Sequence, residues 1–208
     1  MLVSQPNNMA RPVNTDERRR EIVQGLAQVM AERGYAKATV QAIARAAGLT
    51  PGLVHYHFEN KQQILIALIE TLAEAVRARL RATVASPERR LQDAIGALVG
   101  TGAGIDARAV ACWVVIGAEA VREPVVRELY ESVVGQLIAE FEAILREAMQ
   151  KQGGSGAHAA AAAVAVVAAI EGFFRLAAGA PSCVPPGIAS ASIRTIAESF
   201  IAVDLRDE

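Results

Sequence analysis

The side chains best suited to nucleophilic, acid–base or metal chemistry in this chain are His55, His57, Cys112, Glu119 and His158. Such chemistry requires the reacting groups at a spacing that brings them together. His55 and His57 are two positions apart in a predicted helix, so their side chains diverge instead of sharing a metal ion. His158 lies on a different predicted segment from Cys112 and Glu119, and no motif connects the three. We therefore expect no enzymatic activity, no metal site and no cofactor.

A different chemistry, the binding of phosphate, is indicated by Lys61. Asn60 is expected to cap a helix that begins at Lys61, which puts a cation in the first helical turn. The helix dipole favours negative charge at that end, so the cation is unfavourable there by itself. A phosphate beside the helix end would remove the conflict. The position of Lys61 therefore predicts a phosphate contact.

The segment before Lys61, TVQAIARAAGLTPGLVHYHFEN, predicts two short helices joined by a tight corner. Gly48 stands where the first helix must stop, because a residue without a Cβ adopts the left-handed conformation without steric penalty. Thr50 is expected to cap the second helix, with Pro51 at its first position, where a missing N–H costs nothing. This pattern is typical of a DNA-binding helix-turn-helix, but an ordinary helical hairpin in a bundle fits it as well. These residues alone leave both interpretations open.

Residues 22–65 resemble the N-terminal domain of the TetR (tetracycline-repressor-like) family of bacterial transcription regulators. In one place the chain departs from the family pattern: the family often has Tyr-x-Tyr-Phe, whereas this chain has His55, Tyr56, His57 and Phe58. Histidine would then make phosphate contacts that tyrosine usually makes. The matching positions are Ile22, Gly34, Thr39, Val40, Ile43, Ala44, Ala47, Gly48, Leu49, Gly52, Phe58, Lys61, Ile64 and Leu65.

The resemblance implies a function as well as a fold. TetR-like proteins are homodimers whose variable C-terminal domain binds a small molecule and thereby releases the operator. A repressor of this kind is therefore expected. The segment with Cys112, Trp113, Glu119, Ala120 and Pro124 is similar to the betaine-regulator (BetI-like) branch of the family.

The resemblance also implies which side chains contact double-stranded DNA. Thr39 should meet a phosphate and Gln41 a base edge, where Gln suits adenine. Arg45 would hold the backbone or pair with an acidic side chain. The remaining expected contacts are Thr50, Pro51, Gly52 and Leu53, which would touch thymine methyl groups, and His55, Tyr56 and Lys61, which would hold the DNA backbone.

Composition and charge favour a soluble protein with one basic end. The chain has 208 residues, of which 52% are hydrophobic and 21% charged, so it can bury a sizeable core. Residues 1–61 hold eight Lys and Arg against five Asp and Glu, while the remainder holds thirteen against seventeen. A basic head on an acidic body suits a protein that presents one end to phosphate.

Localisation is predicted from what the sequence lacks. Cys112 and Cys183 make no disulfide framework, and residues 1–14 have neither the basic start nor the apolar core of a signal peptide. The longest apolar run, from Ala159 to Ile170, is too short to span a bilayer. We expect a cytoplasmic protein that does not enter the membrane.

Helical spacing recurs along the whole chain, which predicts an all-α protein of about nine helices. Residues 1–14 are expected to be a disordered arm. Residues 15–60 should form a three-helix helix-turn-helix domain, in which Arg18, Arg19 and Arg20 merely face solvent. Residues 61–208 should form a helical bundle for effector binding and dimerisation.

Two connections are predicted within the bundle. Ser86 and Pro87 are expected to start a helix that fades into the glycines at 100, 102 and 104. The glycine-rich residues 153–156 are expected to be a flexible joint.

The effector pocket is the feature for which the sequence gives the fewest indications. Aromatic residues fill bundle interiors more often than they line ligand sites, so core is the first interpretation of each aromatic candidate. With 4% aromatic residues, the body offers no evident cage for a quaternary ammonium. A helical DNA-binding or scaffold protein without an effector therefore remains an alternative. The candidate pocket residues are Trp113, Phe141, Phe173 and Phe174, with Glu119 or Arg175 as the polar partner.

The last two predicted helices, from Ala157 to Ala178 and from Ile188 to Leu205, are expected to form the homodimer interface. The first is apolar on most faces and must be buried on most faces. A second copy of the chain would bury the apolar surface that remains, although both helices could simply complete the monomer's own core. Two-fold symmetry would make the operator palindromic. The stripe expected at the interface is Ala160, Val164, Val167, Glu171 and Phe174.

Overall fold

The computed structural model describes residues 15–83, 89–100 and 106–206. Within these residues there are nine α-helices and two short 3₁₀ helices, and no strand, so the predicted all-α class is confirmed. The predicted arm and the predicted helix start at Ser86 and Pro87 lie outside the described residues. The helices are α1 (Thr15–Arg33), η1 (Tyr35–Lys37), α2 (Val40–Ala46), α3 (Pro51–His57), α4 (Lys61–Ala82), α5 (Arg90–Val99), α6 (Ala107–Ala120), α7 (Pro124–Lys151), α8 (Ala159–Gly179), η2 (Pro181–Cys183) and α9 (Ile188–Asp204).

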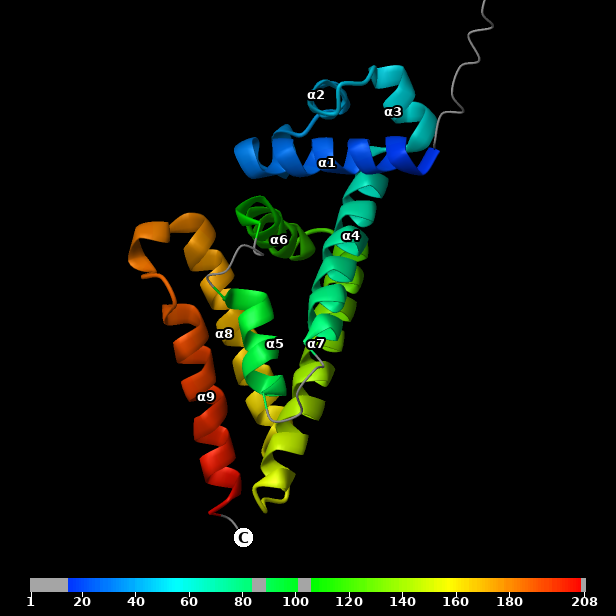
Figure 1. The fold of residues 1–208 in the computed structure, drawn as a ribbon. Coiled ribbons are helices and arrows are strands. Elements are labelled where there is room, and N and C mark those ends of the chain that lie inside the picture. The colour runs from blue at the N-terminus through cyan, green and yellow to red at the C-terminus, as the bar shows by residue number, and fades with distance from the viewer. Residues whose placement is uncertain (1–14, 84–88, 101–105, 207–208) are drawn as a thin grey trace, which may run out of the picture.

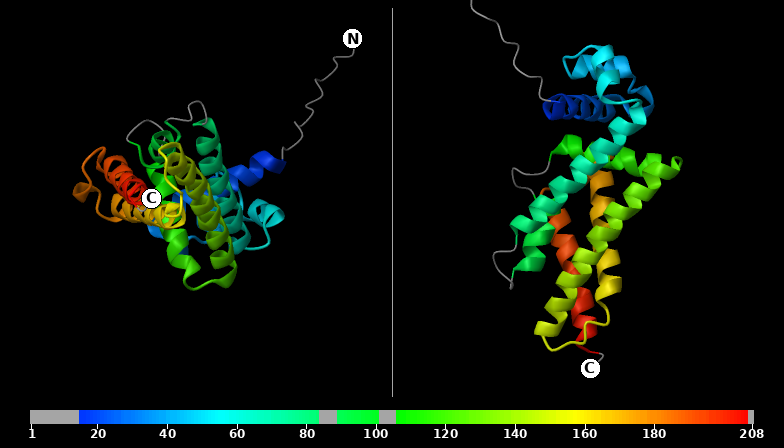
Figure 2. Two further views of the ribbon diagram at one scale, coloured as in Figure 1. Left: turned by 90° about the horizontal axis from the view of Figure 1, so that it is seen from below. Right: turned by 90° about the vertical axis from the view of Figure 1, so that its right-hand side faces the viewer.

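The helices form a small head and a longer body (Figure 1). The head consists of α1, α2 and α3, and α4 leads from it along the body. Figure 2 shows that α2 and α3 lie on the side of α1 that faces away from the body. Helix α6 lies between α1 and the other body helices, in contact with both.

The ends of the head helices follow the chemistry that the sequence predicts. Gly48 has φ +68°, and the Leu49 N–H donates to the Ala44 carbonyl at 2.8 Å, which closes α2 in the manner of a Schellman cap. The Thr50 hydroxyl accepts from the Leu53 N–H at 3.3 Å, and the Asn60 side chain accepts from the Gln63 N–H at 2.9 Å. The corner and both caps are therefore confirmed.

The hydrophobic core of the head extends into the body. Buried residues of α1 to α4 pack in one cluster with Cys112, Ile116 and Ala120 of α6 and Val126 of α7. A second cluster joins α5, α7, α8 and α9. The division into domains after residue 60 stays a prediction, and the contacts of α6 tie the two parts together.

Arg19 and Arg20 are exposed, as expected, but Arg18 and Arg19 also have partners within the head. The Arg18 guanidinium lies 2.7 Å from the Glu21 carboxylate. Arg19 donates to the His57 carbonyl at 2.6 Å and lies 4.1 Å from the centre of the Phe58 ring. Arg19 therefore ties α1 to the end of α3.

The expectation of a flexible joint at residues 153–156 was also wrong. Asp204, at the end of α9, is fully buried and accepts hydrogen bonds from the N–H groups of Gly156, at 2.8 Å, and His158, at 3.0 Å. Gly154 packs so closely that a Cβ there would lie 2.4 Å from Asp204 Oδ2. A buried carboxylate thus holds the connection between α7 and α8.

Helix α8 is longer than its apolar run suggests. It has 21 residues, so among the described helices it is the one that is long and apolar enough to cross a membrane by length and composition. It packs instead against α6, α7 and α9, and buries Val166, Val167 and Ile170 in the second core. We therefore assign α8 as the central helix of the body.

Candidate functional site

The outer surface of the head carries the side chains that the sequence predicts to contact DNA. Leu53 and Lys61 are half-buried in this surface. The exposed members of the set are Thr39, Gln41, Arg45, Thr50, Pro51, Gly52, His55 and Tyr56. Tyr56 has 79% of its surface exposed, which is unusual for a large aromatic residue and suits a side chain that contacts a partner. α2 and α3 therefore present the predicted DNA contacts on one end of the molecule.

Lys61 has a partner that the sequence does not reveal. Its ammonium group donates to the Tyr35 carbonyl at 3.0 Å and lies 3.9 Å from the centre of the Tyr35 ring. The argument that only a phosphate could offset its position at the helix N-terminus was therefore wrong. A phosphate contact by Lys61 stays a prediction that now needs DNA-binding data.

His57 differs from its neighbour His55 in its surroundings. The side chain is half-buried, and its Nε2 atom is buried without a hydrogen-bond partner among the described residues. His55 is exposed. Of the two histidines, His55 is therefore the more accessible one, and its contact with the DNA backbone stays a prediction.

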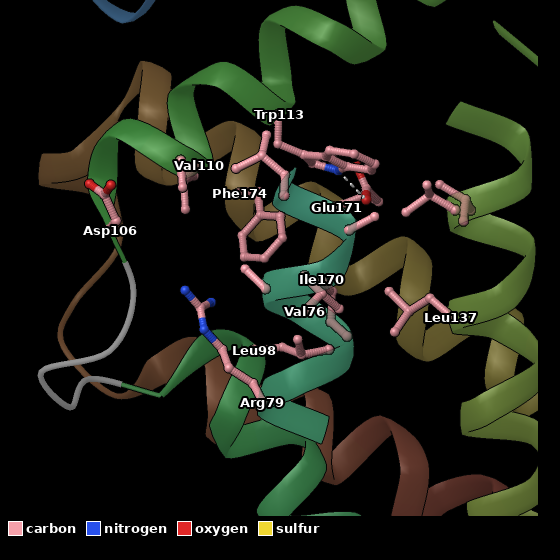
Figure 3. Close-up of a pocket in the computed structure, with 16 residues that line it drawn as sticks. Val76, Arg79, Leu98, Asp106, Val110, Trp113, Leu137, Ile170, Glu171 and Phe174 are labelled. Carbon is pink, nitrogen blue, oxygen red and sulfur yellow. Dashed lines mark hydrogen bonds between the residues drawn. The ribbon is translucent and has the colours of Figure 1, made fainter. Parts of the chain in front are cut away.

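A cavity lies inside the body between α4, α6, α7 and α8, with α5 at one side (Figure 3). It measures about 80 Å³. A cavity of this volume has room for a few water-sized groups. The walls are mostly apolar, with Val76, Leu137 and Ile170 among them. The cavity matches the general pattern of small-molecule sites, in which apolar walls surround a few polar groups.

Glu171 of α8 is one of the charged groups that line this cavity. One carboxylate oxygen accepts from the Trp113 indole N–H at 2.8 Å and the other from the Tyr130 hydroxyl at 3.0 Å. The Trp113 and Tyr130 rings are stacked, with centres 4.9 Å apart. Burial, and then the Glu171 charge, raise the pKa of Tyr130 well above its ordinary value, so the hydroxyl stays a neutral donor.

Two of the predicted pocket residues line the cavity and four do not. Trp113 and Phe174 line it. Phe141 is fully buried in the second core, Phe173 lines a separate groove beside residues 184–187, and Arg175 lines a shallow groove on the outer side of Trp113. Glu119 is not part of the cavity wall. After burial, its charge is the main cause that raises the pKa of Tyr35, in the head, to about 12.

The sequence analysis missed the cavity's own charged groups, which are Arg79, Asp106 and Glu171. For Glu171 a signal was present: it is the single charged residue between Ala159 and Leu176 other than Arg175, in an otherwise apolar helix. An acid in such a helix marks either a buried network or a ligand site. For Arg79 and Asp106 the sequence holds no comparable signal.

Helix α6 connects the cavity to the head. Trp113 lines the cavity, while the adjacent Cys112 is fully buried and donates its thiol to the Ala27 carbonyl of α1 at 3.3 Å. Burial raises the pKa of Cys112 to about 11, so this thiol remains protonated. Helix α6 therefore contacts both the cavity and the head.

A helix-turn-helix head joined to an all-α body with a mostly apolar cavity is the architecture of a ligand-responsive class of DNA-binding regulator. Residues 22–68 match the family model of bacterial regulatory proteins of the tetR family, and residues 87–202 match that of the C-terminal domain of BetI-type transcriptional repressors. The chain belongs to the TetR family, and its body is of the BetI type. The family resemblance inferred from the sequence is thereby confirmed.

Individual relatives agree with this assignment. The transcriptional regulator BetI of Serratia proteamaculans is 31% identical over 148 residues, which cover 67% of this chain and 74% of the relative. BetI of Rhizobium meliloti is 34% identical over 119 residues, 54% of this chain and 56% of the relative. A solved structure of a proposed transcriptional regulator from Saccharomonospora viridis, in complex with choline, has a TM-score of 0.72 at 24% identity, and covers 90% of this chain and 96% of that one.

The family assignment bears on the remaining predictions. TetR-family proteins are soluble transcription regulators, not enzymes. They bind DNA and small-molecule effectors and typically act as dimers. The predicted function, a DNA-binding regulator of transcription, is therefore confirmed.

Proposed function

We propose that this protein is a repressor that binds a palindromic operator as a homodimer and leaves it when a small organic cation enters the cavity beside Glu171. One observation carries the effector class. The Glu171 carboxylate borders a mostly apolar cavity, accepts hydrogen bonds from two neutral donors, and forms no ion pair with any Lys, Arg or His in the described part of the chain.

A carboxylate in such surroundings favours the binding of a cation. Removing a charge from water is unfavourable unless a partner of opposite charge compensates it. The hydrogen bonds from Trp113 and Tyr130 satisfy part of the carboxylate but supply no positive charge. The faces of Trp113 and Phe174 would add cation–π attraction, which is largest where water is excluded. The choline bound in the S. viridis regulator supports the same class of ligand.

This proposal departs from the expectation that the body offers no cage for a quaternary ammonium. The aromatic residues are few, but Trp113 and Phe174 both border the cavity, and Tyr130 stacks behind Trp113. The overall content of aromatic residues does not predict that the fold brings these three side chains together.

Operator contacts are proposed for the exposed residues of α2 and α3. Gln41 and the first turn of α3 are the proposed base contacts, and Thr39, His55, Tyr56 and Lys61 the proposed backbone contacts. Their shared exposure on one end of the head supports this assignment. Arg45 is exposed and has no ion-pair partner among the described residues, which favours a phosphate contact over an internal pair.

Dimerisation is proposed through α8 and α9, but on a different stripe from the one expected. Val167 is 2% exposed and belongs to the monomer's core, whereas Glu171 and Phe174 line the cavity. The apolar residues that point outward support a second copy of the chain as their cover. On α8 they include Ala161, Val164, Ala168, Gly172 and Leu176, and on α9 Ile188, Ala202 and Val203.

The proposal can be tested with the full-length protein and genomic DNA. Selection of bound fragments should enrich a palindromic sequence, and choline should then release the protein from that sequence. Glu171→Gln should bind the same operator with wild-type affinity but need about 10- to 100-fold more choline for release, the loss expected when one charged contact is removed.

A control variant and two contrary results make the test decisive. Glu128→Gln removes an exposed carboxylate of α7 and should respond like the wild type. An unchanged choline response in Glu171→Gln would reject the cation site. Enrichment of no palindrome would favour the alternative of a helical DNA-binding or scaffold protein without an effector.

A further inference from the structure

Lys61 and Tyr35 form a contact between two segments of the head that are distant in the sequence. Tyr35 begins η1, between α1 and α2, whereas Lys61 begins α4. The Lys61 ammonium donates to the Tyr35 carbonyl at 3.0 Å and lies 3.9 Å from the centre of the Tyr35 ring. The ammonium is therefore held by a hydrogen bond to the backbone and by cation–π attraction to the face of the ring.

The Tyr35 side chain is itself fixed by the hydrophobic core that the head shares with the body. It is half-buried and packs against the cluster that contains buried residues of α6 and α7. Burial, and then the charges of Glu119 and Glu123, raise the pKa of Tyr35 to about 12, so the phenol stays neutral. The ring therefore offers Lys61 a fixed and uncharged face.

The Lys61 ammonium keeps part of its hydrogen-bonding capacity for a ligand. It has three N–H donors, of which the Tyr35 carbonyl occupies one and the ring face none. Among the residues that the structure describes, Lys61 has no second acceptor. Two N–H groups therefore remain for a phosphate. Because the side chain is already ordered, the phosphate contact costs less conformational entropy than one made by a freely moving lysine.

We infer that Tyr35 is a positioning residue for DNA binding, whose carbonyl and ring hold the Lys61 ammonium in place for a phosphate of the DNA backbone. Tyr35 acts through Lys61 and not by its own contact with DNA. This inference rests on the phosphate contact proposed above for Lys61. Because the Tyr35 ring packs against the core shared with α6 and α7, it also makes this contact depend on how the head and the body fit together.

A double-mutant cycle on a random-sequence DNA duplex tests this role, because a phosphate contact does not depend on base sequence. Tyr35→Leu keeps the backbone carbonyl and an apolar side chain but removes the ring. In the full-length protein at low salt, it should weaken binding about 3- to 10-fold per protomer, the loss expected when a long side chain must be ordered on binding. In the Lys61→Ala background, the same substitution should change the affinity by no more than about twofold.

Two control variants separate positioning from a general effect on the head. Tyr35→Phe retains both the ring and the carbonyl, so it should bind DNA like the wild type. Lys37 is an exposed cation of η1, and in the described part of the chain it makes no hydrogen bond or cation–π contact with Tyr35. In the Lys37→Ala background, Tyr35→Leu should therefore cause its full loss of affinity.

The contrary outcomes distinguish this inference from the proposals on which it rests. An equal loss from Tyr35→Leu with and without Lys61 would show that the ring acts through the fold of the head, and would overturn the inference. Wild-type affinity of Tyr35→Leu would overturn it as well. If Lys61→Ala keeps wild-type affinity and salt dependence, the phosphate contact is wrong and the inference fails with it. If the wild-type protein does not bind DNA, the proposed function is refuted.

Discussion

Gly25 of α1 provides a sharp test of how the head is assembled. A Cβ added there would lie 2.7 Å from the Ile43 carbonyl oxygen and 3.1 Å from both the Cβ and the backbone nitrogen of Ala47. The groups that it meets are largely the backbone of α2, which cannot move aside as a side chain can. An ordinary carbon–oxygen contact requires about 0.6–0.9 Å more separation, so Gly25→Ala should push α2 away from α1.

The expected free-energy change combines two opposing terms. Replacing glycine by alanine within a helix stabilises it by about 0.5–1 kcal/mol. Overpacking against a fixed neighbour costs about 1–3 kcal/mol. We therefore expect Gly25→Ala to lower the free energy of unfolding by about 0.5–2 kcal/mol and the Tm by a few degrees. Operator affinity should fall because α2 carries Gln41, whereas choline binding should not change.

Gly135 of α7 supplies the matched control. It lies within a helix, is exposed, and has no atom within 4 Å of an added Cβ. Gly135→Ala should therefore raise the free energy of unfolding by about 0.5–1 kcal/mol. Thermal denaturation and operator titration of both variants measure these effects. A Gly25→Ala protein that is more stable than wild type, with unchanged operator affinity, would refute the argument.

The remaining predictions concern charged and titratable groups. The hydrogen bond from the His158 N–H is the largest cause that lowers the pKa of Asp204 from 3.8 to about 2. The ionised carboxylate therefore stabilises the folded protein above about pH 4, and this stabilisation is lost as the pH falls through 2. Acid unfolding of Asp204→Asn, followed by helical signal, should lack this pH-dependent loss of stability. In the native protein at pH 8 a thiol reagent should modify exposed Cys183 and not buried Cys112, and unfolding should expose both; rapid native labelling of Cys112 would contradict its contact with α1. Lys61→Ala should weaken binding to all DNA sequences and reduce the salt slope by about one per half-site, and an unchanged slope at full affinity would exclude the phosphate contact. Gln41→Ala should cost about 1–3 kcal/mol on the operator and little on random DNA; equal losses on both would assign Gln41 to the backbone.

Single side chains explain where prediction from the sequence failed. Lys61 was interpreted from its own helix alone, so its contacts with Tyr35, 26 positions away, could not be foreseen. Arg19 was assigned to solvent because the end of α3, which it contacts, is 38 positions away. In both cases a long side chain found a backbone carbonyl brought near by tertiary packing. Helical periodicity holds no information about such contacts.

The residues around the cavity show that side-chain type also fails to predict position. Trp113 and Phe174 were identified as candidates because they are aromatic, but Phe141 has the same chemistry and lies in solid core. Glu171 was assigned to the dimer stripe, although it accepts hydrogen bonds from α6 and α7. Which face of α8 meets the cavity depends on how α6 and α7 pack against it, and composition does not determine that.

The sequence by itself determined the helices, their caps, the corner at Gly48 and the family. These features depend on contacts within a few residues or on a motif with fixed spacing, and both can be recognised in one dimension. Only the tertiary structure decided that Gly25 is a point of close contact while Gly135 is free, that Asp204 fixes the connection before α8, and that Glu171 and Arg79 border one cavity. Each of these depends on segments far apart in the chain meeting in space, which no local pattern encodes.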